Sequence, residues 1–497
     1  MIRDMTPDTS SELRMPARFR SVRRDVVVIG GGPAGMAAAL AASQCGAHAA
    51  LVDERPSLGG QVYKQFSPAF QVADGMQGAG YRRGRDMIAA VLASSVEVLT
   101  DTAVWGIWGR DVFVCRSEDE VQCIHADTII IAAGAYDRPL PFPGWTLPGV
   151  ITAGGGQSLA KVFRVAPGHR ILMAGSGPLS LSFAAELKHY GANVIMVTEA
   201  CRRPTAAAVW GLFRASPGNW ASLREGIAYL AALHAHGVPL RWSTMIRRAE
   251  GRGRVERAII AKVDRHWQAI PGSEETVDVD AICLGYGLCP SNELTRLCGC
   301  AHGYDEQRGG WVPWRDEWMR SSVPGVLVAG DCAGISGAAA AVDEGHVAGL
   351  AAAVASGRVS ADRATVLAQR ARRRLRRHQR FRKALDAMYP VGAGLYDLAN
   401  ESTVICRCEE VTLSEIRAAL AHGLPDAQGV KVFTRAGMGF CQGRMCGRQV
   451  AAEVARAAGR PISSVASFSV RPPIKPLAIA AVAVEMPERR RPIVRLD

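Results

Sequence analysis

Four of the thirteen cysteines lie close together near the C-terminal end of the sequence and could hold a metal. Cys406 and Cys408 form a C-x-C pair, and Cys441 and Cys446 form a C-x4-C pair after 32 intervening residues. Four thiolates from two loops can hold either zinc or an iron–sulfur cluster. The C-x-C spacing fits structural zinc less well, and nearby glycines let backbone N–H groups approach sulfides. We predict a [2Fe–2S] cluster; a zinc site and four unrelated cysteines are the alternatives.

A glycine-rich turn between two strand-like runs could bind a dinucleotide. The apolar run 25–29 leads into Gly30, Gly32 and Gly35, a helical pattern follows, and a second strand ends at Asp53. In such a unit the first glycine makes the tight turn, the second lets a pyrophosphate approach, and the third packs helix on strand. Asp53 lies 23 residues after Gly30, near the distance expected for an acid that holds a ribose hydroxyl. The unit predicts dinucleotide binding.

A second unit of the same kind starts near residue 170. Its glycine-rich turn contains Gly175 and Gly177, but Ser180 stands where the third glycine is expected. Glu199, after the next strand, favours a free ribose hydroxyl, whereas the two arginines that follow would suit a phosphate. NAD(P) or another nucleotide is the candidate ligand. A unit retained for packing, with no nucleotide, is the alternative, and the sequence does not decide.

Two further segments belong with the first unit: the apolar strand 127–134 ends in small residues, and the strand 326–331 ends in Gly-Asp. With the two fingerprints, they resemble the two-dinucleotide-binding-domain flavoproteins from residue 25 to about 357. The resemblance implies that the first unit holds FAD and that Asp331 hydrogen-bonds its ribityl-phosphate region. The FAD-site residues it implies are Gly30, Gly32, Pro33, Ala34, Gly35, Asp53, Gln61, Ala133, Gly134, Gly330 and Asp331, while Gly175 and Gly177 belong to the second site.

The flavoprotein core lacks the groups that its relatives use for catalysis. Where one disulfide-reductase branch has its redox pair, residues 58–63 contain no cysteine, so no dithiol can relay electrons to a disulfide. The histidines form no evident acid/base couple with a carboxylate. His346 could face the flavin, but a helix-surface or core position is expected. We therefore expect a core that holds flavin and passes electrons, with its catalytic residues unidentified.

The cysteine-rich segment also carries a resemblance. Residues 406–412 and 434–446 resemble the bacterioferritin-associated-ferredoxin-like [2Fe–2S] domain, which would place Arg435 and Arg444 near the cluster. A flavoprotein core and this domain in one chain look like the α-type subunit of heteromeric amine dehydrogenases, which include the larger flavoprotein chain of opine oxidase, the B subunit of hydrogen cyanide synthase and D-hydroxyproline dehydrogenase α subunits. Residues 144–150, 285–290 and 470–474 add to the match.

The composition of the 497 residues excludes several classes. With 48% hydrophobic and 21% charged residues, the chain is neither collagen-like, nor disordered, nor a small disulfide scaffold. The net charge of +13 is partly local, since the stretch 363–383 holds nine Arg and one Lys but no acid. Few aromatic residues interleave with these charges, so we predict a solvated basic helix rather than a nucleic-acid site.

The sequence contains no apolar signal region and no uncharged run of about 18 apolar residues, so we expect no membrane span. We expect a cytoplasmic protein that is membrane-associated at most through its partners. Disulfides are unlikely there, and the nine scattered cysteines are expected to be small buried hydrophobes.

The predicted fold is α/β, with two Rossmann-like dinucleotide-binding domains, one inserted in the other, and a small α-rich C-terminal [2Fe–2S] domain. The predicted boundaries are a flexible tail at 1–24, an FAD domain at 25–144 and 286–357, the second Rossmann domain at 145–285, a basic linker helix at 358–400, the [2Fe–2S] domain at 401–455 and a C-terminal tail at 456–497.

Three functions follow as hypotheses. The leading one is an FAD- and [2Fe–2S]-containing electron-transfer subunit of an amine or amino-acid dehydrogenase of opine, hydroxyproline or glycine type, with an FAD-dependent amine-oxidising partner and an acceptor in the respiratory chain. The second is a self-contained NAD(P)H-dependent reductase. The third is an adaptor that docks on an iron-store protein through residues 401–455.

Overall fold

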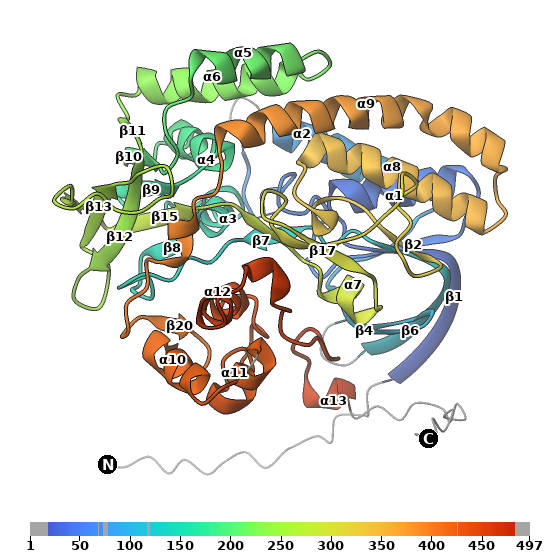
Figure 1. The fold of residues 1–497 in the computed structure, drawn as a ribbon. Coiled ribbons are helices and arrows are strands. Elements are labelled where there is room, and N and C mark those ends of the chain that lie inside the picture. The colour runs from blue at the N-terminus through green and yellow to red at the C-terminus, as the bar shows by residue number, and fades with distance from the viewer. Residues whose placement is uncertain (1–17, 68, 73–77, 117–119, 425, 483–497) are drawn as a thin grey trace, which may run out of the picture.

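The first β-sheet of the computed structural model carries the N-terminal glycine-rich turn at its edge (Figure 1). The structure describes residues 18–482 except 68, 73–77, 117–119 and 425. The strand order is β3-β2-β1-β6-β5-β4, with β19 also paired to β6. These strands are β1 Arg18–Ile29, β2 Ala49–Val52, β3 Glu97–Leu99, β4 Thr102–Trp108, β5 Asp111–Arg116, β6 Glu120–Ile131 and β19 Val326–Val328. The central strands are parallel and continuously apolar because both sheet faces are covered.

The predicted N-terminal tail is wrong from Arg18 onward. β1 begins there and pairs with β6 in parallel, from Arg18 opposite Glu120 to Arg24 opposite Ala126. The sequence hides this because polar residues fill the extension, which has no continuous apolar run. Pairing with a neighbour remote in sequence forms it, assisted by an ion pair of 2.8 Å between Arg23 and Asp127. Residues 1–17 lie outside the described residues.

Four helices cover the first unit: α1 Pro33–Gln44, α2 Ala79–Leu92, α8 Ala338–Ala355 and α9 Ala361–Met388. α1 and α8 approach closely, because Gly345 and Gly349 on α8 lie directly against the backbone oxygens of Ala34 and Ala38. By length and composition α8 could cross a membrane, but two-thirds of it is buried between α1 and α9. It is therefore the core helix of this unit.

The second unit is a parallel sheet of order β11-β10-β9-β15-β8, with an antiparallel meander of β12, β13 and β14 beside it (Figure 1). Its strands are β8 Val150–Thr152, β9 Ile171–Gly175, β10 Val194–Glu199, β11 Leu240–Trp242, β12 Thr244–Glu250, β13 Arg257–Lys262, β14 Glu275–Asp278 and β15 Ala281–Gly285. Its helices are α3 Ala153–Lys161, α4 Pro178–His189, α5 Ala206–Ala215 and α6 Trp220–Ala235. It leaves and re-enters the first unit through the antiparallel pair β7 Ala135–Asp137 and β16 Leu288–Pro290.

The return to the first unit passes through short elements before β19. These are α7 Glu293–Leu297 and the hairpin of β17 His302–Asp305 and β18 Gly310–Pro313, and the turn η2 Asp331–Ala333 follows β19. One Rossmann-like unit is thus inserted in the other, which confirms the predicted fold class.

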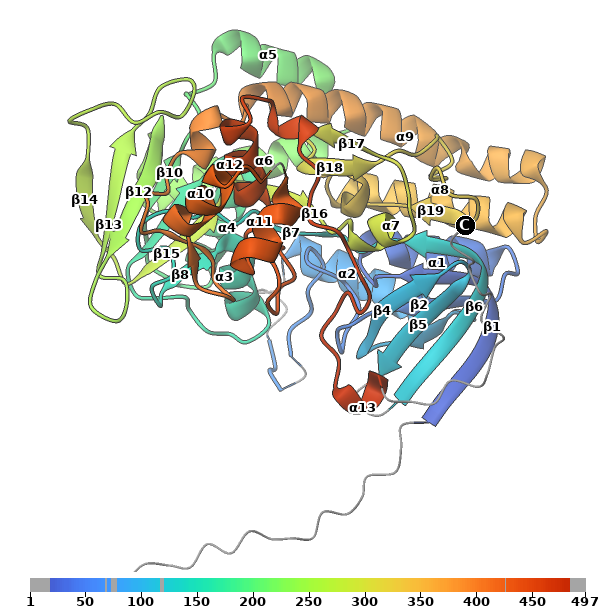
Figure 2. The same cartoon turned by 60° about the horizontal axis from the view of Figure 1, so that its bottom comes forward.

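The C-terminal residues form a small helical module that packs against both units (Figure 2). Its elements are η3 Ala393–Tyr396, β20 Val404–Cys406, β21 Val411–Thr412, α10 Leu413–Ala421, α11 Ala427–Thr434, α12 Gly447–Ala457, η4 Ile462–Ser464 and α13 Ile479–Val482. The segment predicted as a tail from residue 456 instead runs back to the first sheet. There the N–H of Ile474 donates to Trp105 O at 2.9 Å, and Ile474 is buried.

Candidate functional site

The first glycine-rich turn has the geometry that a pyrophosphate site requires. Gly30 has φ +106° and lies against Ala132 O, so a side chain there would be excluded on both counts. Gly35, in the first turn of α1, contacts Gly30 O and lets helix and strand pack closely. A Cβ on Gly32 would meet nothing nearer than 3.8 Å. The backbone at Gly32 is therefore open to a ligand at the N-terminus of α1, which begins with Pro33 and Ala34.

Asp53 lies at the end of β2 and holds this turn. Its Oδ2 accepts from the N–H of Gly31 at 2.5 Å, and its Oδ1 accepts from the N–H of Arg55 at 2.8 Å. Burial raises the pKa of Asp53, although these two N–H groups partly oppose the rise. The structure thus brings the predicted ribose-binding acid to the predicted turn.

The late Gly-Asp turn reaches the same place from the far end of the sequence. Gly330 lies between Ala34 of α1 and Ala341 of α8, so the first turns of two helices meet there. Asp331 Oδ1 accepts from the N–H groups of Ser336 and Gly337 at 2.8 and 3.1 Å. Two helix N-termini at one spot favour a negatively charged ligand such as a diphosphate.

A buried ion pair that the sequence analysis missed fixes this turn. Arg315 binds the Glu344 carboxylate through two N–H···O contacts of 2.9 and 2.6 Å, and Glu344 accepts from the N–H of Gly330 at 2.7 Å. Both side chains are almost fully buried. No local pattern marks the pair, because its members are 29 residues apart.

The loop after β2 carries Gln61 and packs against the first turn. Gly60 of this loop lies close to Gly32, and Gln61 is exposed beside it. Ala133 and Gly134 follow β6 at the same edge of the sheet, where Gly134 O accepts from the N–H of Ser291 at 3.0 Å. Every residue predicted for the FAD site therefore lies on the loops and helix ends around this edge.

Lys64 is a second group that the sequence analysis missed. Its side chain is buried at the boundary of the two units, where Nζ donates to Ser158 Oγ and, at 3.5 Å, to Gly154 O. Burial lowers the pKa of Lys64 to about 8. Burial also raises the pKa of neighbouring Asp137, on β7. A lysine with this pKa can hold or release a proton near neutral pH.

The second glycine-rich turn is built on the same plan. Glu199 is buried and accepts from the N–H groups of Gly177 and Cys201 at 2.8 and 2.9 Å. Burial raises the pKa of Glu199. Ser180 Oγ donates to Gly285 O at 3.1 Å, so serine fits here because Gly175 leaves room for it. The substitution of the third glycine thus adds a hydrogen bond and does not disrupt the turn.

The four clustered cysteines come together in two pairs in the C-terminal module. Thiol hydrogen bonds join Cys406 to Cys446 and Cys408 to Cys441. Backbone N–H groups of Gly437, Glu409 and Cys408 also point at Cys406 Sγ. In residues 18–482, gaps aside, no three Cys, His, Asp or Glu side chains are arranged as a ready-made metal site. Convergent N–H groups are nevertheless what a thiolate ligand needs, so the residues fit a cluster.

Two arginines expected beside the cluster have structural partners. Arg435 is largely exposed and pairs with Glu409 at 2.8 Å. Arg444 pairs with Glu293 of α7 at 3.0 Å and, through Nη1, donates to Cys441 O at 3.3 Å. Arg444 therefore ties the cysteine pair to the first unit.

A larger charged contact docks the module near the flavin-side strands. Arg448 of α12 donates to Glu306 at 2.9 Å, and Arg138, directly after β7, donates to the same carboxylate at 2.7 Å. Burial acts to raise the pKa of Glu306, but the two guanidiniums outweigh it and hold that pKa below its usual value. Arg448 lies two residues after Cys446, so the cysteine module sits over the strand pair that follows Gly134.

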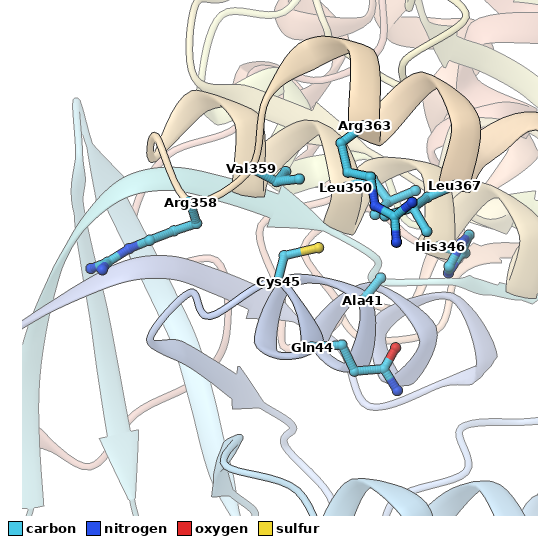
Figure 3. A pocket seen from close by; sticks show the side chains of 9 residues that line it. All are labelled: Ala41, Gln44, Cys45, His346, Leu350, Arg358, Val359, Arg363 and Leu367. Carbon is cyan, nitrogen blue, oxygen red and sulfur yellow. The ribbon is translucent and has the colours of Figure 1, made fainter.

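A cavity lined by titratable groups lies far from this edge. Figure 3 shows Cys45 and His346 lining a cavity of about 320 Å³ with Arg358 and Arg363. Cys45 ends α1, about 18 Å along the helix from the glycine turn. His346 therefore does not face the predicted flavin site.

Comparisons with known proteins agree with this geometry. Residues 24–345 match the pyridine nucleotide-disulphide oxidoreductase family, and residues 400–485 match the sarcosine oxidase A3 domain. The chain is 32% identical to the A-type chain of opine oxidase from Agrobacterium tumefaciens (strain Ach5), covering 92% of this chain and 91% of that protein. It is 33% identical to hydrogen cyanide synthase subunit HcnB of Pseudomonas protegens, covering 92% and 96%. The L-proline dehydrogenase structure from P. horikoshii shares the fold, with a TM-score of 0.66, 23% identity and coverage of 94% and 80%.

Proposed function

The chain belongs to the pyridine nucleotide-disulphide oxidoreductase family as an α-type FAD flavoprotein subunit, and from that premise we propose that it carries electrons within a heteromeric amine or amino-acid dehydrogenase. An FAD-dependent partner subunit would oxidise an amine of opine, hydroxyproline or glycine type, and this chain would deliver the electrons to an acceptor such as the respiratory chain. Relatives that match nearly the whole chain are named as subunits, which supports a partner.

The observation that carries the proposal is the docking of the cysteine pairs over the edge of the flavin unit. The Arg448–Glu306–Arg138 contact holds the module against residues that follow Gly134. When bound, FAD would supply a two-electron carrier and a [2Fe–2S] cluster a one-electron carrier. The rigid charged contact would keep the two sites at a constant separation.

The chain's own residues have assignable roles in that arrangement. Gly32 and the N-termini of α1 and α8 would receive the pyrophosphate, and Asp53 and Asp331 would orient the ribose and ribityl groups. Lys64 Nζ would hold a proton between the two units. Cys406, Cys408, Cys441 and Cys446 would ligate the cluster, with the N–H of Gly437 directed at a sulfur.

The cluster assignment is tested by metal analysis of the full chain purified without oxygen. We expect about two iron and two acid-labile sulfide per chain. Cys446→Ala should lose the iron but keep the flavin, because the two sites lie on separate modules. Cys283→Ala, a buried cysteine of β15, is the matched control and should keep both. Stoichiometric zinc without sulfide would reject the cluster.

The subunit role is tested by activity with and without a partner. The chain alone should reduce no dye with opines, proline derivatives, sarcosine or glycine, and adding the amine-oxidising subunit should restore turnover. Substrate-dependent dye reduction by the isolated chain would move the substrate site into this sequence.

The open backbone at Gly177 keeps one alternative in view, a self-contained NAD(P)H-dependent reductase. Rapid bleaching of the flavin by NADH or NADPH would favour that activity. The subunit proposal expects no such bleaching.

A further inference from the structure

Two helices of the second unit expose an unusual number of large apolar side chains. We call α5, α6 and the turn between them the aromatic hairpin. Only Leu212 of α5 and Leu233 of α6 are buried. The apolar side chains that are 42 to 60% exposed are Val209, Trp210, Phe213, Trp220, Ile227 and Leu230. A contiguous exposed patch of this kind marks an interaction site.

The aromatic members of the patch form one cluster around the turn. The rings of Trp210 and Phe213 stack with centroids 5.5 Å apart, and Phe213 meets Trp220 edge-on at 5.3 Å. These side chains therefore present a single surface, although they come from two helices.

A stripe of positive charge runs past the same turn. Arg370, Arg373, Arg377 and Arg380 on α9 are spaced three, four and three residues apart, which places them on one face of the helix. All four are exposed, and within the part of the chain that the structure describes none forms an ion pair with an acid. The opposite face of α9, with Ala364, Ala368, Ala371 and Leu375, is buried on the core.

The basic stripe and the aromatic hairpin are physically joined. Arg377 lies directly against Gly218 in the hairpin turn, and the ring of His378 contacts Asn219 Oδ1 at 2.6 Å. Figures 1 and 2 show α5 and α9 along the same edge of the molecule, away from the cysteine module. One face thus combines exposed aromatic rings with unpaired cations.

Acidic side chains are nearly absent from the hairpin. Residues 206–235 contain one acid, Glu225, and it is paired with Arg83 at 3.0 Å. An anionic surface that approached the face would meet attraction from the arginine stripe and no uncompensated negative charge.

We propose that the aromatic hairpin and the arginine stripe dock the protein on the surface of a membrane that contains anionic lipid. α5 has ten residues and α6 sixteen, which is too short to span, so the hairpin would lie in the headgroup region with its aromatic rings at the boundary. Arginines at headgroup level add attraction to anionic lipid. This inference does not depend on the redox proposal, because it uses neither the flavin edge nor the cysteines.

The test is flotation of the full chain, purified with any subunit that accompanies it, on vesicles of phosphatidylcholine alone or mixed with phosphatidylglycerol. We expect binding to the mixed vesicles, at least about tenfold weaker binding to the neutral ones, and release by high salt. The double variant Trp210→Ser, Phe213→Ser should lose binding. The double variant Arg370→Gln, Arg373→Gln should weaken binding to mixed vesicles by about fivefold per charge, with little change on neutral ones.

Trp108→Ser is the matched control, since Trp108 is 48% exposed on β4 of the first sheet. It should bind vesicles like the wild type. Unchanged circular dichroism and melting temperature would show that the hairpin variants are folded. Failure of the wild type to bind mixed vesicles would overturn the proposal. So would retained binding by the Trp210/Phe213 variant, or loss of a partner subunit from that variant, which would assign the face to a protein interface.

Discussion

The two dinucleotide-binding units hold their glycine-rich turns alike but surround them differently. In each, a buried acid at the end of the second strand accepts from a turn N–H: Asp53 from Gly31 in the first, Glu199 from Gly177 in the second. The first turn is also met by Gly330, between the first turns of α1 and α8. In the second, Ser180 takes the third glycine's place, and Cys201 Sγ donates to Pro390 O of the linker after α9 at 3.3 Å. The same local pattern thus serves two different environments, so the fingerprint alone does not identify a ligand.

The strongest way to break this comparison is to block each turn in the same manner. Gly32→Val fits the free protein, where a Cβ meets nothing nearer than 3.8 Å, but places a side chain where the pyrophosphate must lie. We expect flavin content, measured by absorbance after denaturation, to fall from about one per chain to near zero. Gly177→Val should leave flavin unchanged. Full flavin in the first variant, or none in the second, would reverse the assignment of the units.

The buried pair beside the first turn should give the largest effect on stability. Arg315→Met leaves Glu344 charged and unpaired, so the free energy of unfolding should fall by about 3–5 kcal/mol. Arg320→Met removes a half-exposed pair with Asp316 and should cost less than about 1 kcal/mol. Denaturant titration measures both. Equal small losses would show that Glu344 becomes protonated or solvated in the variant and that the turn does not depend on the pair.

Lys64, at the boundary of the units, should make stability depend on pH. Its pKa of about 8 in the folded chain lies below the usual 10.5, so the unfolded chain binds more protons between these values. The free energy of unfolding should therefore rise with pH from about 8 to 10.5, by about 3 kcal/mol. Comparing the wild type with Lys64→Met across this range isolates the contribution. The variant should lack this rise; parallel curves for the two proteins would mean that Lys64 titrates normally.

The two strand-end acids should give the smallest and most similar effects on stability. Asp53→Ala and Glu199→Ala each leave backbone N–H groups without an acceptor, at a cost of about 1–3 kcal/mol. We expect them to differ in flavin affinity, which should weaken for Asp53→Ala and stay unchanged for Glu199→Ala. Flavin titration of the apoprotein measures this. Equal weakening would mean that the second turn supports the flavin site indirectly.

The sequence alone was sufficient for features that are encoded within a short stretch. Both glycine turns, Asp53, Glu199 and the Gly-Asp turn at 330–331 could be predicted, because each depends on a strand, a turn and a helix that follow one another. The inserted order of the two units followed from the order of these motifs. The predicted start of the first strand was wrong, because residues 18–24 are polar and gain their structure from β6, about a hundred residues away.

The tertiary structure alone decided which remote side chains meet. It joined Arg315 to Glu344, buried Lys64 between the units, and linked Arg448 and Arg138 through Glu306. It also brought Arg377 of α9 to the turn of the aromatic hairpin. Local sequence determines backbone conformation through steric preferences and hydrophobic periodicity. Ion pairs, burial and exposed patches depend on how the elements pack, and no short stretch of sequence contains that information.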